Sequence, residues 1–160
     1  MTTYIHYGSS KFHSFFPVKN QTMNTKPIGG LWASPIDSCK GWREWCERTQ
    51  FQYANLDEYF KFHLTDGAKI LHIQCATQLD HLPHQHLNDG VCGIEIQSIY
   101  TMLDFEALQK EYDGIELHLS EEIFPDDVNW NYKSLYYRLY GWNCDSLLVF
   151  NDKVIKLTNE

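Results

Sequence analysis

The chain has 160 residues, 43% hydrophobic and 15% aromatic, which predicts a single domain over residues 1–160 with a core built largely from rings. Its formal net charge of −8 argues against a general polyanion-binding surface, because such a surface needs an excess of Lys and Arg. Apolar runs stay short of the roughly 20 residues that cross a bilayer, and the start "MTTYIHYGSSKF" lacks the basic and apolar parts of a signal peptide, so we expect a cytoplasmic protein without a membrane partner.

Turn residues divide the chain into short periodic segments, which indicates a compact α+β unit. We expect a first strand over 3–8 ("TYIHYG"), because it is rich in β-forming residues and is ended by Gly and Ser. A second short strand is expected over 28–34 ("IGGLWAS"). Asp37 and Ser38 are placed to cap a helix that turns both of its tryptophans toward the core.

The middle of the chain carries a hairpin signal. The segments 59–65 ("YFKFHLT") and 68–74 ("AKILHIQ") flank the turn dipeptide Asp66-Gly67, which predicts two antiparallel neighbours. Residues 76–82 are expected to form a helical turn, whereas 84–100 show no pattern that decides their structure.

The last third has clearer periodicity. Asp104 is expected to cap a helix that keeps its apolar residues on one side. The strict alternation over 114–120 ("GIELHLS") predicts a half-buried strand with Glu116 on its polar face. Residues 134–142 fit either a short helix or an extended aromatic segment, and 146–151 ("SLLVFN") fit a strand.

The short motifs that most directly name a function are missing: GxGxxG, GxxxxGK[ST], HExxH, CxxC and GxSxG. The usual phosphate and zinc motifs are thereby excluded. His81, His84 and His86 lie close together, but a proline interrupts them, and a solvated polar loop is the favoured interpretation. The five cysteines are odd in number and scattered, which is typical of reduced, mostly buried thiols. No metal site is predicted.

Trp32 stands among small residues in "GGLWASP", residues 29–35. Glycine weakens a strand unless a ligand or another backbone must come close. This segment is therefore either a tight structural corner or one wall of a binding cleft. Trp42 and Trp45, by contrast, have helical i, i+3 spacing and are most simply anchors of the core.

Three segments together resemble the sequence blocks of the ADP-ribosyltransferase superfamily: 5–10 ("IHYGSS"), 29–34 ("GGLWAS") and 141–155 ("GWNCDSLLVFNDKVI"). In that family the first block reads like "YHGTS" or "YRG", the second like "GLYFA" or an STS strand, and the third places a carboxylate before a last strand of the "VVFDPDQI" type. The resemblance implies an ADP-ribosyltransferase-like α+β domain, with a split mixed or antiparallel sheet and flanking helices. It also implies NAD as the co-substrate.

The first block implies contacts to the cofactor. Gly8 matches the glycine whose backbone holds the nicotinamide carboxamide, and Ser9 matches the hydroxyl residue that follows. The position before that glycine is usually His or Arg, but here it is Tyr7. Either Tyr7 contacts the ribose, or the register slips by one residue and His6 does.

The second block implies the wall of the nicotinamide site. Trp32 matches the aromatic residue on which the nicotinamide ring stacks. Gly30 would let the cofactor approach the backbone, and Ser34 occupies the nearby hydroxyl position.

The third block implies the catalytic acid. Loss of nicotinamide leaves an oxocarbenium-like ribosyl centre, which a carboxylate stabilises in the transition state. The alignment of the block points to Asp145 or Ser146, so Asp145 is the first candidate and Glu116 the second. A serine in this position would leave the catalytic charge unaccounted for, and the chain would then bind NAD without turning it over.

The resulting hypothesis is an enzyme that transfers ADP-ribose from NAD to a protein side chain, a nucleobase or a small molecule. By analogy alone, a protein of this size would suit a bacterial or viral effector. Two other classes stay open. One is a module that binds or sequesters a nucleotide without catalysis, and the other is an interaction protein that uses exposed aromatic residues as a partner surface.

Overall fold

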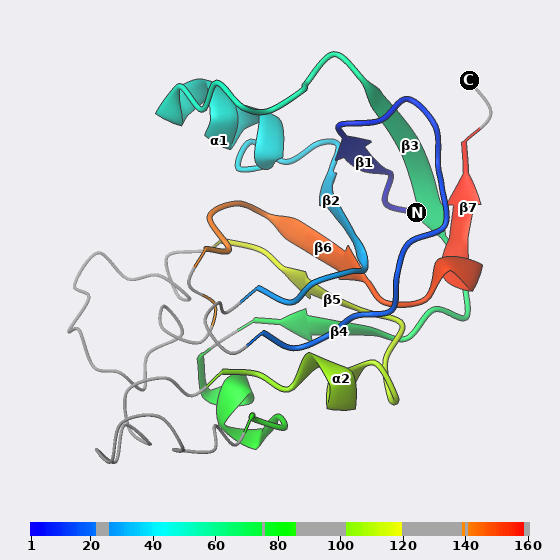
Figure 1. Ribbon diagram of the computed structural model, residues 1–160, viewed down its shortest axis with the longest axis vertical. Coiled ribbons are helices and arrows are strands. Elements are labelled where there is room, and N and C mark those ends of the chain that lie inside the picture. Colours follow the sequence, from blue (N-terminus) through cyan, green and yellow to red (C-terminus); the bar gives the residue numbers. More distant parts are fainter. Residues whose placement is uncertain (22–25, 75, 86–101, 120–138, 140, 159–160) are drawn as a thin grey trace.

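The computed structural model describes residues 1–21, 26–74, 76–85, 102–119, 139 and 141–158, with Ala76 and Thr77 described by their backbone alone. Within this part of the chain, seven strands form one mixed sheet in the order β4-β5-β6-β2-β1-β3-β7. Figure 1 shows the sheet curled into a half-barrel, with α1 and α2 at opposite ends of the molecule. The predicted α+β class is confirmed, although a sheet of this kind is not specific to ADP-ribosyltransferases.

The elements are short. The strands are β1 (Tyr4–Tyr7), β2 (Leu31–Pro35), β3 (Tyr59–Leu64), β4 (Ile70–Ile73), β5 (Gly114–Leu117), β6 (Ser146–Val149) and β7 (Ile155–Leu157). The helical elements are α1 (Trp42–Thr49), α2 (Phe105–Leu108) and the 3₁₀ turns η1 (Ala76–His81) and η2 (Asp152–Val154). No helix in the described residues is long and apolar enough to span a membrane.

The predicted hairpin over 59–74 is wrong, although both of its strands exist. β3 pairs with β1 and β7, whereas β4 pairs in parallel with β5 at the other edge of the sheet. Each strand buries its apolar residues against a different core: Phe62 of β3 is fully buried in one cluster, and Ile73 of β4 is buried in the other. Tertiary burial therefore overrides the local turn signal.

Helix α1 begins later than the sequence predicts. Asp37 and Ser38 do not cap it, because the residue at the cap position is Gly41, whose cap makes no side-chain hydrogen bond. The hydroxyl of Ser34 on β2 accepts the N–H of Trp42 at 3.0 Å instead. A strand side chain therefore satisfies one of the N–H groups that every helix leaves free in its first turn.

The last third keeps its predicted elements, but α2 ends at Leu108 and not near Tyr112, and β5 differs in its burial. Asp104 caps α2 as expected, with its carboxylate accepting the N–H of Ala107 at 3.0 Å. β5, however, is buried on both faces, and Glu116 is only 3% exposed. The prediction of a half-exposed strand is wrong because the curled sheet covers both sides of β5. Residues 86–101 and 120–138 lie outside the described residues, as do the expectations for them.

The sheet separates two hydrophobic clusters. The first contains Ile115, Leu117 and Leu148 of the sheet and packs against α2. The second contains side chains of β1, β2, β3 and β6: Tyr4, Leu31, Ala33, Phe62, Leu147 and Val149. Because side chains alternate along a strand, each face of β6 serves a different cluster, and both faces of the central strands are buried.

Candidate functional site

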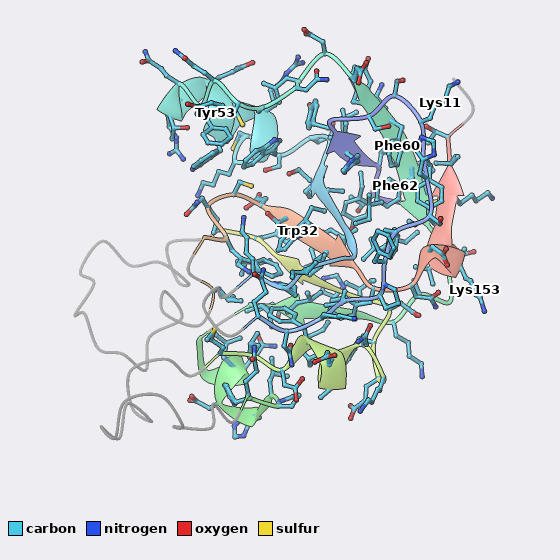
Figure 2. The ribbon with its side chains drawn as sticks, in the orientation of Figure 1. Lys11, Trp32, Tyr53, Phe60, Phe62 and Lys153 are labelled. Atoms are coloured by element: carbon cyan, nitrogen blue, oxygen red, sulfur yellow. The ribbon has the colours of Figure 1, made fainter. Side chains whose placement is uncertain are left out.

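A cavity of about 280 Å³ lies where β1 diverges from β2. The two strands pair only at Tyr4–Pro35 and Ile5–Ser34, beyond which β2 pairs with β6. Beyond these two pairs, the end of β1 and the start of β2 form no hydrogen-bonded ladder with each other, and the cavity lies between them. Figure 2 shows Trp32 near the middle of the molecule, between the side of α1 and the lower strands.

Four of the residues predicted for the cofactor site line this cavity: His6, Tyr7, Trp32 and Ser34. The remaining lining residues are Ile5, Lys26, Ala33, Trp42, Cys144 and Ser146. The structure thus brings together residues of the first block, residues of the second block and the two neighbours of Asp145, but not Asp145 itself.

His6 bridges the gap between the diverging strands. Its Nδ1 lies 2.7 Å from the backbone oxygen of Trp32. Because a carbonyl oxygen can only accept, Nδ1 must carry the proton, and in the neutral ring Nε2 is then the acceptor. The ring also lies 5.0 Å from that of Phe60, so its orientation is fixed on two sides.

Tyr7 contributes a phenol at the cavity wall. Burial raises the pKa of Tyr7 above its ordinary value, and the nearby Arg43 lowers it in part. The guanidinium of Arg43 lies 5.7 Å from the centre of the Tyr7 ring, within the range of a cation–π interaction. At neutral pH the phenol therefore stays protonated and can donate a hydrogen bond.

The amine of Lys26 lies over the ring of Trp32. The Nζ of Lys26 lies 5.0 Å from the ring centroid, and Trp142 meets the same ring edge-on with a centroid separation of 4.6 Å. Burial lowers the pKa of Lys26, and Cys144 acts in the opposite direction. Burial also raises the pKa of the Cys144 thiol. The wall formed by Trp32 thus combines an indole, an amine and a protonated thiol.

Trp42 was assigned to the core by its spacing, but the structure places it at the cavity. Its ring stacks on Trp45 at 5.0 Å with an interplanar angle of 15°, and both indoles are only half-buried. The prediction that both point into the core is wrong, since Cys46 is the buried residue of α1. Helical spacing alone cannot separate a core face from a cavity wall, so no sequence signal identifies Trp42.

The first candidate acid, Asp145, does not line the cavity. Its Oδ2 accepts the hydroxyl of Ser38 at 2.6 Å, and its Oδ1 accepts the N–H of Leu119 at 2.6 Å. Cys144 and Ser146 do line the cavity, with Cys144 Sγ and Ser146 Oγ 3.3 Å apart. Asp145 therefore clamps the loop before α1 to the end of β5.

The second candidate acid, Glu116, also points away. Its neighbours on β5 join the cluster that contains Trp32, so Glu116 faces the other side of the sheet. There it accepts the hydroxyl of Tyr4 at 2.9 Å and lies 2.9 Å from His72 Nδ1 and 3.1 Å from His118 Nε2. A buried carboxylate with three donors is well satisfied as a structural group.

Three residues predicted to bind the cofactor lie outside the cavity lining. Gly8 is exposed and donates its N–H to Glu58 at 2.8 Å, while Ser9 bonds within its own loop. A Cβ on Gly30 would lie 2.7 Å from a methyl group of Leu148 and 2.9 Å from a backbone oxygen. Gly30 is therefore the tight structural corner, and none of the three lines the cavity.

Comparison with protein-family models, curated proteins and solved structures finds no match for this chain. The described residues also contain no group of three or more His, Cys, Asp and Glu side chains that could hold a metal ion. His86 of the histidine cluster lies outside them. The functional argument therefore depends on the shape and chemistry of the cavity.

Proposed function

We propose that this domain binds a nucleotide of the NAD type in the cavity beside β1 and β2, and that it holds the ligand without cleaving it. One observation carries the proposal. The described residues that line the cavity supply the large rings of Tyr7, Trp32 and Trp42, a lysine, a histidine and two serine hydroxyls, but no carboxylate.

Rings and donors in this combination suit a nucleotide. Flat aromatic side chains stack on bases of any sequence, at about 1–3 kcal/mol for each base. The hydroxyl of Tyr7 and the ring of His6 are placed to contact a ribose. Cavities for whole small molecules span about 300–1,000 Å³, so a volume of about 280 Å³ suits one ring with its sugar, and the rest of a dinucleotide would extend outside.

The lack of a carboxylate among the described lining residues supports binding rather than turnover. Cleavage of the nicotinamide–ribose bond develops positive charge on the ribose, and a nearby carboxylate would stabilise it. Of the two positions to which the resemblance points for the acid, Ser146 lines the cavity and Asp145 does not. The hydroxyl of Ser146 donates to the backbone oxygen of Cys144 at 2.8 Å. A neutral hydroxyl already engaged by the backbone does not replace the charge.

Calorimetric titration with NAD and NADH, together with an assay of nicotinamide release from NAD labelled on the adenylate, tests the proposal. We expect saturable binding of a dinucleotide and no release. Release that disappears in Asp145→Asn or Glu116→Gln would instead establish ADP-ribosyl transfer, with the label then identifying the acceptor. Absence of binding by both nucleotides would overturn the proposal.

The chain offers a matched pair of variants. Trp42 and Trp45 are stacked, half-buried indoles on the same helix, but only Trp42 lines the cavity. Trp42→Ala should weaken binding about tenfold or more, the loss of one stacked ring, whereas Trp45→Ala should change it less than about threefold. Equal losses in the two variants would show that the effect comes from the helix and not from the cavity.

A further inference from the structure

The open side of the cavity follows from the exposure of its lining residues. The buried lining residues form its inner end: Ile5, Ala33, Ser34, Cys144 and Ser146. The other lining residues are only half-buried, and Tyr7 and Trp42 are among them. A ligand that is larger than the cavity must therefore extend outward past half-buried side chains of this kind.

Tyr7 lies next to a second ring that is outside the cavity lining. Tyr7 and Tyr59 are paired directly across β1 and β3, and their rings meet edge-on with centroids 6.1 Å apart. Tyr59 is 38% exposed, and the Nζ of Lys61 lies 5.5 Å from the centre of its ring. Two neighbours therefore hold the ring of Tyr59 in place, while part of it stays open to solvent.

A cation lies at the same side of the cavity. The guanidinium carbon of Arg43 is 5.7 Å from the centre of the Tyr7 ring. Its Nε makes an exposed ion pair with Glu47 Oε1 at 3.6 Å, and exposed pairs of this kind contribute little. A phosphate can compete for the guanidinium, because it accepts two parallel hydrogen bonds from the planar group. We call Tyr7, Tyr59 and the cations over their rings the tyrosine strip.

A second row of rings runs from Trp42 through Phe51 to Tyr53, with a centroid separation of 5.8 Å at each step. The charged part of a dinucleotide distinguishes the two rows. Within the described residues, cation–ring contacts beyond the cavity occur along the tyrosine strip and not at Phe51 or Tyr53. The tyrosine strip therefore suits a diphosphate better than the second row does.

We propose that the part of the dinucleotide outside the cavity lies along the tyrosine strip, with its second base stacked on Tyr59 and its diphosphate near Arg43. The site then prefers a dinucleotide to a mononucleotide. This inference rests on the proposed function, because it extends the same site. Glu44 and Glu47 bring negative charge near Tyr7, so most of the preference comes from the stacked base and not from the phosphate.

The test is to titrate the full chain with NAD and with nicotinamide mononucleotide, which lacks the second nucleoside. We expect NAD to bind about tenfold tighter or more, the gain from one stacked base. In Tyr59→Ala the affinity for NAD should fall about tenfold, whereas the affinity for the mononucleotide should change less than about threefold. Binding of the mononucleotide by this variant also shows that it is folded.

Two control variants accompany Tyr59→Ala. Tyr59→Phe keeps the ring and should keep the preference for NAD. Tyr53→Ala removes a ring that is 91% exposed and lies beside α1 in Figure 2, and it should leave both affinities unchanged.

Arg43→Gln tests the phosphate contact. It should weaken the binding of NAD and of the mononucleotide by a similar factor, because both carry phosphate, and should leave the binding of nicotinamide riboside unchanged. Arg48→Gln, at an exposed position of the same helix, should alter none of the three affinities. An equal loss for the riboside in Arg43→Gln would overturn the assignment of Arg43.

The outcomes separate the two proposals. If neither NAD nor the mononucleotide binds, the proposed function fails. If the mononucleotide binds as tightly as NAD, or if the preference for NAD survives in Tyr59→Ala, the inference about the tyrosine strip is overturned while nucleotide binding in the cavity stands.

Discussion

The imidazole of His118 lies between two carboxylates, with Nε2 3.1 Å from Glu116 Oε1 and Nδ1 3.6 Å from Asp145 Oδ2. The two acids that sequence reasoning selected for catalysis are thus joined to each other through one ring. Together with Tyr4 and His72, they link the first strand to the edge of the sheet. Their role in this position is to hold the strands in register, on the side of the sheet that faces away from the cavity.

Glu116→Gln should therefore lower stability and leave nucleotide affinity unchanged. The amide keeps the volume but weakens the hydrogen bond from Tyr4 and the contacts to the two histidines, and we expect the free energy of unfolding to fall by about 1–3 kcal/mol. Urea denaturation measures the change. Glu111→Gln, at an exposed position, is the control and should stay within about 0.5 kcal/mol. A loss of nucleotide affinity in folded Glu116→Gln would contradict this assignment.

Alanine substitutions at three glycines distinguish the cost of backbone strain from the cost of steric clash. Gly30 combines a φ of +69° with contacts below 3 Å for an added Cβ, Gly8 has a φ of +105° with open space, and Gly67 has open space without a positive φ. Alanine substitutions should destabilise in the order Gly30, Gly8, Gly67. Strain alone costs on the order of 1 kcal/mol, and the clash at Gly30 adds to it. Melting temperatures of the three variants give the order of destabilisation. A small decrease for Gly30→Ala would contradict the tight packing described around Gly30.

Alkaline pH should destabilise the fold partly through Tyr4. Burial, followed by the charge of Glu116, raises the pKa of Tyr4 far above its ordinary value of 10.0. The folded state thus keeps the phenol proton at pH values where the unfolded state loses it. The stability from this group is complete below the unfolded pKa and is lost as the pH rises toward the folded pKa.

Melting temperatures measured between about pH 9 and 11.5 should therefore fall more steeply for the unmodified chain than for Tyr4→Phe. Some dependence will remain, because burial also raises the pKa of Tyr7 and of Cys144. Parallel curves for the two proteins would show that Tyr4 does not carry the effect.

Ser34→Ala should affect both stability and binding. Its hydroxyl donates to the backbone oxygen of Asp145 at 2.8 Å and accepts the N–H of Trp42 at 3.0 Å. Removing a buried group that bonds a helix start costs about 1–2 kcal/mol, and Trp42 loses its anchor at the cavity. Ser9→Ala changes a loop hydroxyl instead and should alter neither the unfolding free energy nor the nucleotide affinity. Unchanged affinity in Ser34→Ala would contradict the role of this bond.

Local sequence signals predicted most of the strands but not their partners. The turn at Asp66-Gly67 joins β3 to β4, yet these strands lie near opposite edges of the sheet. β7 (Ile155–Leu157) was not predicted, since three residues give too little periodicity to detect. The cap at Asp104 was predicted correctly because it depends only on residues within one turn of it.

The residues of the candidate site also differ in whether the sequence could have identified them. Cys144 and Asp145 lie in a bend before β6, so strand alternation could not have shown which of these side chains faces the cavity. No pattern could have brought in Lys26, because its place beside Trp32 and Gly141 depends on segments that are distant in sequence. The predictions for Gly8, Ser9 and Gly30 followed from the block alignment, which does not say which backbone groups already have protein partners.

The sequence by itself determined which segments can be strands or helices, since hydrophobic period, caps and turn residues act over a few positions. The prediction of a core built largely from rings is wrong, because most of the buried hydrophobic residues are aliphatic. Only the tertiary structure decided which face each side chain occupies, because the curl of the sheet and the divergence of β1 from β2 depend on how distant segments bury their apolar area together. That collective burial places Trp42 and Lys26 at the cavity and turns Asp145 and Glu116 away from it.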